Sequence, residues 1–221
     1  MFFLSSSTNT VLPALVARLV LVALFFIHAF SANAESKMDS ATTTSLQTAV
    51  FAGGCFWGVD AVFKHVKGVA SVESGYAGGN ADKANYEAVS SGRTGHAEAV
   101  RVRFNPAQVS YQQLLQVFFV IAHDPTQLNR QGPDVGSQYR SAIFFADLEQ
   151  QKTATEQIQK LTADRTFGKP IVTQIAALQQ FYPAEQYHQN YLALHPNQPY
   201  IVINDQPKIE HLRKQFPALY Q

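Results

Sequence analysis

Cysteine is almost absent from this chain of 221 residues, and neither sign of charge dominates. Cys55 is the single cysteine, and 17 Lys and Arg stand against 16 Asp and Glu. One cysteine cannot close an internal disulfide, which excludes a disulfide-stabilised scaffold. The sequence also lacks a Cys-x-x-Cys pair and histidines spaced four apart, so no metal site is expected. A near-neutral chain argues against nucleic acid or anionic lipid as the main partner.

Long apolar runs are scarce too, and the most prominent one lies near the start. Within residues 1–34 the lone charged residue, Arg18, precedes the apolar stretch Leu19–Ile27, and Ala32-Asn33-Ala34 forms a small-x-small cleavage site. These features predict a signal peptide that is removed near Ala34 and a mature protein exported to the periplasm. The apolar stretch is short beside the roughly 20 residues that span a bilayer. An inner-membrane anchor is the alternative.

Residues 35–45 are small and polar and predict a flexible tail, which leaves 46–221 as a single domain. In that domain the apolar pattern alternates between strand-like and helix-like periods. Strands are predicted at 48–52, 69–76, 97–104, 139–146 and 171–178, helices from 55, from 110 and at 148–163, 183–194 and 208–215, and a loop at 80–95. This alternation indicates an α/β or α+β domain of two layers without an internal repeat.

The stretch 97–104 has the cleanest strand pattern. Val100, Val102 and Phe104 fall on one face, with an arginine between each pair on the other face. Glu98 falls on the apolar face, so its carboxyl should be desolvated, and desolvation raises a carboxyl pKa. Glu98 is therefore a candidate proton donor near neutral pH. A solvated carboxylate at a frayed strand end is the alternative.

The stretch Gly53–Gly58 holds the one cysteine and the one tryptophan of the chain, at the first turn of a helix that follows a strand. Free backbone N–H groups and the helix dipole favour a thiolate there, which predicts a lowered pKa for Cys55 and a nucleophilic role. Glycines on both sides should let a ligand approach the sulfur. The alternative is a cysteine and a tryptophan buried in the core without a chemical role.

Several motifs together resemble one family. Gly54–Gly58 reads Gly-Cys-Phe-Trp-Gly, and further stretches follow in order at Val72–Gly79, Tyr86–Val89, Gly92–Glu98, His123–Pro125, Asp134 and Gln138–Ala142. Over about residues 47–195 the sequence resembles the A-type peptide methionine sulfoxide reductases. The fold expected is α+β: a two-layer sandwich with a ferredoxin-like core, a mixed sheet and flanking helices.

The resemblance implies an oxidoreductase that repairs proteins under oxidative stress by reducing the S epimer of methionine sulfoxide, protein-bound or free. Cys55 would attack the sulfoxide sulfur and be left as a sulfenic acid. Glu98 would protonate the oxygen, and Tyr86 and Tyr139 would hydrogen-bond it. The remaining implied site residues bind the substrate: Phe56 and Trp57 would hold its methyl group, and Asp134 would line the same pocket.

The sequence departs from the family pattern in the residues that return the oxidised cysteine to a thiol. Most relatives carry further cysteines near the C-terminus that resolve the sulfenic acid as a disulfide, and this chain has none. We therefore expect an external thiol (thioredoxin, glutaredoxin or a small thiol) to reduce Cys55, with no bound cofactor and a monomeric enzyme. The histidines His96, His123 and His188 are expected to be structural. Rival functions are a cysteine hydrolase with a His base, a one-cysteine peroxidase, and an exported module that binds Met-containing peptides without catalysis.

Overall fold

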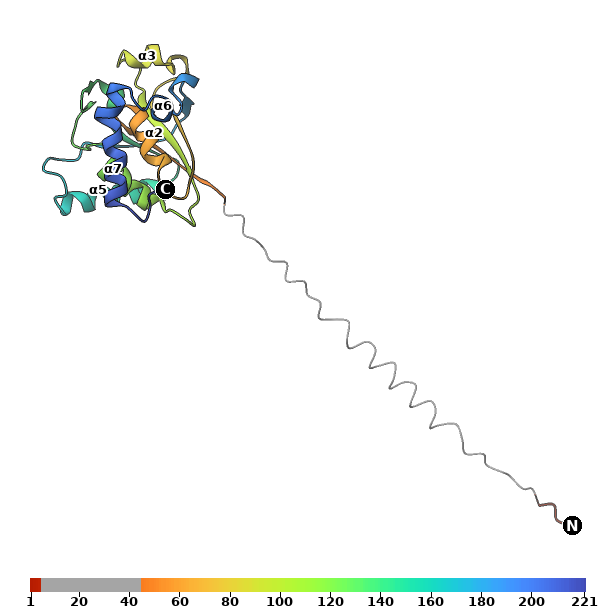
Figure 1. Ribbon diagram of the computed structural model, residues 1–221. Coiled ribbons are helices and arrows are strands. Elements are labelled where there is room, and N and C mark those ends of the chain that lie inside the picture. Colours follow the sequence, from red (N-terminus) through yellow and green to blue (C-terminus); the bar gives the residue numbers. More distant parts are fainter. Residues whose placement is uncertain (5–44) are drawn as a thin grey trace. The chain divides into compact units, whose positions relative to one another are not determined.

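A mixed sheet of six strands forms the centre of the fold in the computed structural model, which describes residues 1–4 and 45–221 (Figure 1). The strand order is β7-β6-β1-β3-β2-β8, and every neighbouring pair is antiparallel except β6 and β7. The strands are β1 Gln47–Gly53, β2 Val69–Ala77, β3 Ala97–Phe104, β6 Ser141–Phe145, β7 Gln174–Ala177 and β8 Phe181–Pro183, and a separate hairpin pairs β4 Arg130–Gln131 with β5 Asp134–Val135. The predicted α+β fold with a mixed sheet and flanking helices is confirmed.

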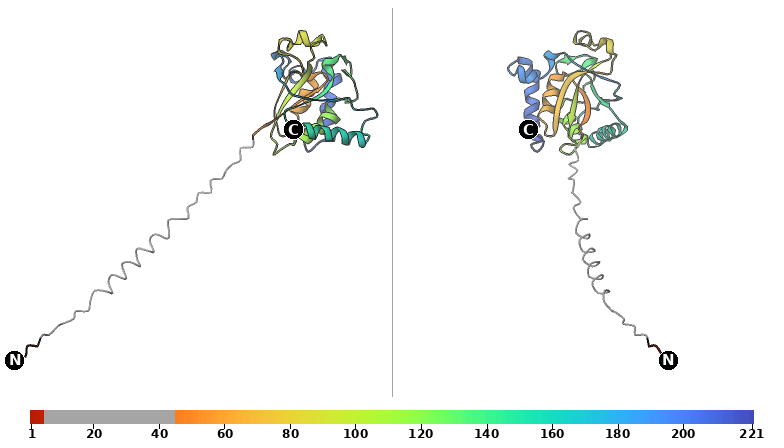
Figure 2. Two further views of the ribbon diagram at one scale, coloured as in Figure 1. Left: turned by 180° about the vertical axis from the view of Figure 1, so that it is seen from behind. Right: turned by 90° about the vertical axis from the view of Figure 1, so that its right-hand side faces the viewer.

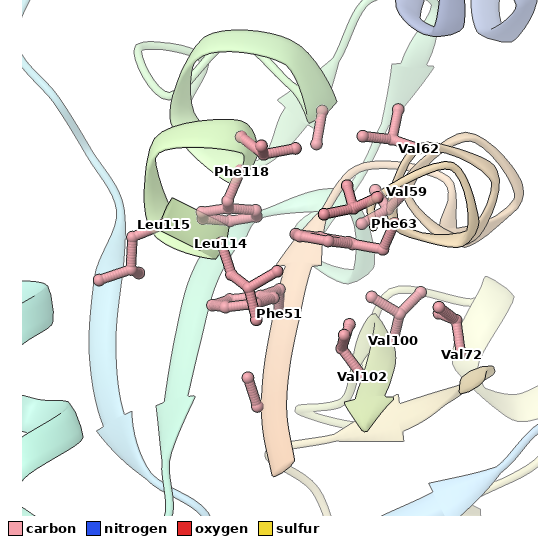
Figure 3. Packing of buried hydrophobic residues seen from close by; sticks show 14 of the residues in the cluster. Phe51, Val59, Val62, Phe63, Val72, Val100, Val102, Leu114, Leu115 and Phe118 are labelled. Atoms are coloured by element: carbon pink, nitrogen blue, oxygen red, sulfur yellow. The ribbon is translucent and has the colours of Figure 1, made fainter. Parts of the chain in front are cut away.

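Helices pack against one face of the sheet and build the larger core. They are α2 Phe56–Lys64, α4 Tyr111–Val117, α5 Leu148–Ala163 and α7 Gln206–Gln215. Phe51 of β1 lies at the centre of this core, with its ring 5.2 Å from that of Phe63 and 5.0 Å from that of Phe118 (Figure 3). Burial of one such side chain contributes about 1.5–3 kcal/mol. Val50 and Ala52 point to the opposite face, so β1 is buried on both sides.

Shorter elements connect these parts. They are the helices α3 Tyr86–Ser90 and α6 Tyr191–Leu194, the 3-10 turns η1 Ala81–Lys83, η3 Ser137–Tyr139 and η4 Gln186–His188, and the π-helical turns η2 Phe118–Ala122 and η5 Ile201–Asp205. The turn η5 leads directly into α7, which packs beside α2 (Figures 1 and 2). This packing brings the C-terminal segment to the start of α2.

Local signals placed most elements correctly. β3 has the predicted bounds, Ser110 and Gln113 form a capping box at α4, and the side chain of Asp147 caps α5. The helix predicted at 183–194 is wrong, because Pro183 ends an edge strand and Asn190 has a positive φ of 55° that breaks the helical path.

Two other predicted elements need correction. The loop predicted at 80–95 contains α3, whose first turn is capped by the side chain of Asn85. The strand predicted at 139–146 is shorter, because η3 occupies its start. The signal peptide predicted at 1–34 and the tail at 35–45 lie almost wholly outside the described residues. Within the described part of the chain, no helix is long and apolar enough to cross a membrane.

Candidate active site

Cys55 occupies the N-cap of α2, directly after the turn that ends β1, and its side chain is partly buried. Gly54 makes this turn with a φ of 91°, a conformation that glycine adopts without strain. A Cβ at Gly54 would lie 2.5 Å from Cγ of Gln131, and one at Gly58 would clash with the carboxylate of Asp205. These two glycines therefore make room for side chains of the protein itself. Their role in letting a ligand approach the sulfur stays a prediction.

Glu98 lies on β3 with its side chain turned into the protein, and the residue is 2% exposed. Its Oε2 accepts a hydrogen bond of 3.1 Å from the backbone N–H of Phe56, the residue after Cys55. Burial raises the pKa of Glu98 to about 8, against the opposing effect of the Phe56 hydrogen bond. The carboxyl is thus mostly protonated at neutral pH, and the burial predicted from the strand pattern is confirmed.

The thiol of Cys55 does not match the expectation of a lowered pKa. Burial raises its pKa well above the usual value, and the nearby carboxyls of Glu98 and Asp205 raise it further. The backbone N–H of Trp57 acts in the opposite direction but is outweighed. The helix start supplies one hydrogen bond, whereas desolvation and two acids favour the neutral form. These effects together favour a neutral thiol at Cys55.

Tyr86 and Tyr139 reach the same region from different segments. Tyr86 is the first residue of α3, and burial followed by the charges of Glu98 and Cys55 raises its pKa. Tyr139 ends η3, and burial followed by Glu98 and Asp134 raises its pKa. The structure thus gathers both tyrosines around Cys55 and Glu98, with Asp134 beside them. Both hydroxyls, with their raised pKa values, stay neutral and can donate hydrogen bonds.

The two aromatic residues that follow Cys55 are fixed by different partners. Phe56 is 1% exposed and packs against the ring of His188, with centroids 5.0 Å apart. Trp57 stacks on Tyr191 at 3.6 Å with the rings 5° from parallel. Its indole N–H donates a hydrogen bond of 3.2 Å to Nδ1 of His188. These contacts hold an apolar wall next to Cys55.

The histidines have other partners. In His123, Nδ1 donates to the Phe118 carbonyl at 2.8 Å and Nε2 accepts from the Ser141 hydroxyl at 2.6 Å. His96 is buried, and its Nε2 lies 2.9 Å from the Asn80 carbonyl. These hydrogen bonds favour the expected structural role of His123 and His96 over the role of a general base in a hydrolase. The described residues contain no cluster of three or more His, Cys, Asp or Glu side chains able to hold a metal ion.

Sequence reasoning missed residues from the C-terminal segment. The hydroxyl of Tyr200 donates a 2.5 Å hydrogen bond to Oδ2 of Asp134, and Tyr200 and Lys208 line a cavity together with Cys55. Asp205 is fully buried and forms an ion pair with Lys208 at 3.1 Å. The packing of α7 on α2 places these residues, and no short motif in the sequence indicates it.

Comparisons with known proteins identify the family. The family model for peptide methionine sulfoxide reductase matches residues 47–219. A relative from Mesorhizobium japonicum named peptide methionine sulfoxide reductase MsrA 2 is 54% identical over 83% of this chain and 94% of its own. One from Deinococcus radiodurans, peptide methionine sulfoxide reductase MsrA, is 52% identical over 77% of this chain and 82% of its own.

A solved structure shows the same relationship. Methionine sulfoxide reductase A of Corynebacterium diphtheriae aligns with a TM-score of 0.62 and 36% identity, over 69% of this chain and 76% of that one. Together with the matched family model and the relatives from two other bacteria, this alignment shows that the chain belongs to the A-type peptide methionine sulfoxide reductases.

Proposed function

We propose that Cys55 and Glu98 together reduce the S epimer of methionine sulfoxide to methionine, in proteins and as the free amino acid. The observation that carries this assignment is the hydrogen bond between Glu98 and the amide that follows Cys55. It fixes a protonated carboxyl next to the nucleophile. Attack at a sulfoxide sulfur needs such an acid, because negative charge develops on the oxygen.

The first half-reaction transfers oxygen from the substrate to the enzyme. The sulfur of Cys55 bonds to the sulfoxide sulfur while Glu98 gives its proton to the oxygen and Tyr86 and Tyr139 donate hydrogen bonds to it. The intermediate collapses to methionine and a Cys55 sulfenic acid, and the proton lost by the thiol returns to Glu98. The raised pKa of the carboxyl is supportive, because the acid keeps its proton until substrate arrives. The thiol, whose pKa is also raised, must lose its proton as it attacks.

The preference for one epimer follows because the site fixes two groups on the substrate sulfur, its methyl group and its oxygen. The apolar wall of Phe56 and Trp57 receives the methyl group on the substrate sulfur, and Asp134 lines the pocket near Tyr139. The oxygen must face Glu98. With the methyl group and the oxygen of the chiral sulfur both placed, one configuration only directs the rest of the substrate out of the pocket and leaves the sulfur open to attack by Cys55. The family's S epimer is the one we assign to this site.

Regeneration uses thiols from outside the chain, because Cys55 has no cysteine partner. One thiol displaces the oxygen of the sulfenic acid as water and forms a mixed disulfide, and a second thiol releases Cys55 as a free thiol. Thioredoxin, glutaredoxin or a small thiol could each supply the two thiols.

The test is an assay on separated S and R sulfoxides of a Met derivative with dithiothreitol, comparing the wild type with Cys55→Ser. The wild type should reduce the S epimer alone, and Cys55→Ser should be inactive. Without reductant, mass spectrometry should find one oxygen added to Cys55. Equal turnover of both epimers, or an unmodified Cys55 after many turnovers, contradicts the assignment. A cysteine hydrolase would instead show an acyl-enzyme.

We also propose that the enzyme is exported to the periplasm after cleavage near Ala34 and acts there as a monomer. The arrangement of Arg18, the apolar stretch Leu19–Ile27 and the small-residue site supports export. N-terminal sequencing of the protein recovered from the envelope tests it: a start near Glu35 is expected, whereas an intact N-terminus contradicts cleavage. Light scattering of the mature protein tests the monomer.

A further inference from the structure

A cavity of about 210 Å³ reaches Cys55 from the side of the C-terminal segment. Besides Cys55, its lining includes Pro133 and Asp134 from the β4–β5 hairpin, and Tyr200, Ile203 and Lys208 from η5 and α7. The cavity is not lined by the residues that we assign to binding the oxygen and the methyl group of the sulfoxide. Those residues are Phe56, Trp57, Tyr86, Glu98 and Tyr139. Cys55 is therefore also open to a space that these five side chains do not line.

Asp134 marks the boundary between the two regions. Its charge is among the causes that raise the pKa of Tyr139, which belongs to the substrate side. Its Oδ2 also accepts the hydroxyl of Tyr200, which belongs to the cavity. Asn204 donates a side-chain hydrogen bond of 3.0 Å to the carbonyl of Tyr200 and so holds the C-terminal wall in shape. The two regions thus share Asp134 and Cys55 but are built from different segments.

The chemistry of a lone cysteine requires a second approach to the sulfur. After the first half-reaction, the oxygen of the sulfenic acid lies on the side of Glu98 and the tyrosines. A thiolate that displaces it must attack the sulfur from a direction away from the departing oxygen. The cavity beside Tyr200 is a second opening to the sulfur, and none of the donors assigned to the departing oxygen lines it.

We propose that this cavity admits the sulfur of a small-molecule thiol that reduces the Cys55 sulfenic acid, by a path separate from that of the sulfoxide; the inference rests on the function proposed above. The thiol sulfur bonds to the sulfur of Cys55, the S–O bond breaks, and the hydroxyl leaves with the thiol proton as water. The sulfenic sulfur is reduced and the thiol sulfur is oxidised. Lys208 lines the cavity, and a nearby ammonium favours the attacking thiolate.

Ile203 is the position to test, because it lines the cavity and is 71% exposed, so a larger side chain there fills space without disturbing the core. Ile203→Trp narrows the cavity. Val202→Trp is the matched control: Val202 is the preceding residue, is 44% exposed and is not part of the lining. Ile203→Ala widens the cavity and serves as a second variant.

Two rates are measured for each protein. The first is methionine formed in a single turnover without reductant. The second is the rate at which sulfenic acid is lost after dithiothreitol or, in a parallel sample, reduced thioredoxin is added. The remaining sulfenic acid is trapped with dimedone and measured by mass spectrometry. Ile203→Trp should lower the second rate at least tenfold and leave the first within twofold of the wild type. Val202→Trp and Ile203→Ala should not slow either rate.

The opposite pattern overturns the inference. Slower single turnover with an unchanged reduction step would make the cavity the path of the sulfoxide, and no change in either rate would show that no reactant uses it. Slowing with thioredoxin but not with dithiothreitol would show that Ile203 contacts a protein instead. If the wild type forms no sulfenic acid, the proposed function fails, and that result is distinct from these.

Discussion

The backbone N–H of Phe56 donates a 3.1 Å hydrogen bond to Oε2 of Glu98, a residue 42 positions further along the chain. This bond joins the first turn of α2 to β3 at the point where Cys55 begins the helix. It leaves the carboxyl free to keep its proton, because one oxygen accepts the amide and the other can carry the hydrogen. Glu98 and Cys55, the acid and the nucleophile that we propose, are therefore linked through a single contact.

Replacing Glu98 should show that the protonated form of its carboxyl takes part in the reaction. With a pKa of about 8, Glu98 is protonated below that pH and loses its proton above it, so the single-turnover rate of the wild type should fall as the pH rises through about 8. Glu98→Gln keeps an acceptor for the Phe56 amide but has no proton to give. We expect it to lower kcat/KM by about 10²–10⁴ and to abolish this fall. A wild-type rate that still increases from pH 8 to pH 9 would be inconsistent with the assignment.

The same carboxyl should make stability depend on pH. The pKa of Glu98 is raised from 4.5 in the unfolded chain to about 8 in the folded one. The stability it contributes is therefore present below about pH 4.5 and is lost as the pH rises toward 8. Above pH 8 a buried carboxylate destabilises the fold, so Glu98→Gln should unfold at a higher temperature than the wild type at pH 9. At pH 5 the gap should be much smaller; an equal gap at both pH values would rule out this linkage.

The two tyrosines should act as parallel donors to the sulfoxide oxygen. Loss of one donor to a developing oxyanion typically costs about 10²–10³ in rate, and a remaining neighbour softens that cost. We therefore expect Tyr86→Phe and Tyr139→Phe each to reduce the single-turnover rate by about tenfold and the double variant by far more. Tyr187→Phe, which alters an exposed hydroxyl, is the control. Wild-type rates in the double variant would exclude the role.

His188 should support substrate binding through Trp57. His188→Gln weakens the acceptor for the indole N–H, and a hydrogen bond worth about 1 kcal/mol corresponds to roughly fivefold in binding. KM for the sulfoxide should rise by about that factor with kcat little changed. His195→Gln, at an exposed position, should behave as the wild type. A complete loss of kcat in His188→Gln would favour the hydrolase with a His base.

The contact between α2 and the C-terminal segment should tolerate no added atom at Gly58. A methyl group there would clash with the buried Asp205 carboxylate and lie 2.7 Å from Nζ of Lys208. We expect Gly58→Ala to destabilise the protein by about 1–3 kcal/mol and lower Tm. Gly168→Ala is the matched control, because nothing lies within 4 Å of a Cβ there. Equal Tm values for both variants would show that the segment moves aside freely.

The alternation of residues along β3 was enough to predict that Glu98 is buried, because side chains of a strand point to opposite faces in turn. The capping residues Ser110 and Asp147 were equally readable, since a cap is a contact between residues three apart. The helix predicted at 183–194 is wrong because the conformation of this segment depends on contacts with residues that are distant in sequence. Its residues follow the edge of the sheet and the pocket around His188 instead of their own periodicity.

The sequence by itself determined that Cys55 is the single thiol available as a nucleophile and that no second cysteine can resolve it, because both statements depend only on residue identity and order. Tertiary structure decided the ionisation of Cys55. A helix start predicts a lowered pKa, but burial and the carboxyls of Glu98 and Asp205 reverse the sign. It also decided the cavity beside Tyr200, whose partner Asp134 lies 66 positions away. Desolvation and long-range contacts exist only once the chain is packed, so no local pattern could encode them.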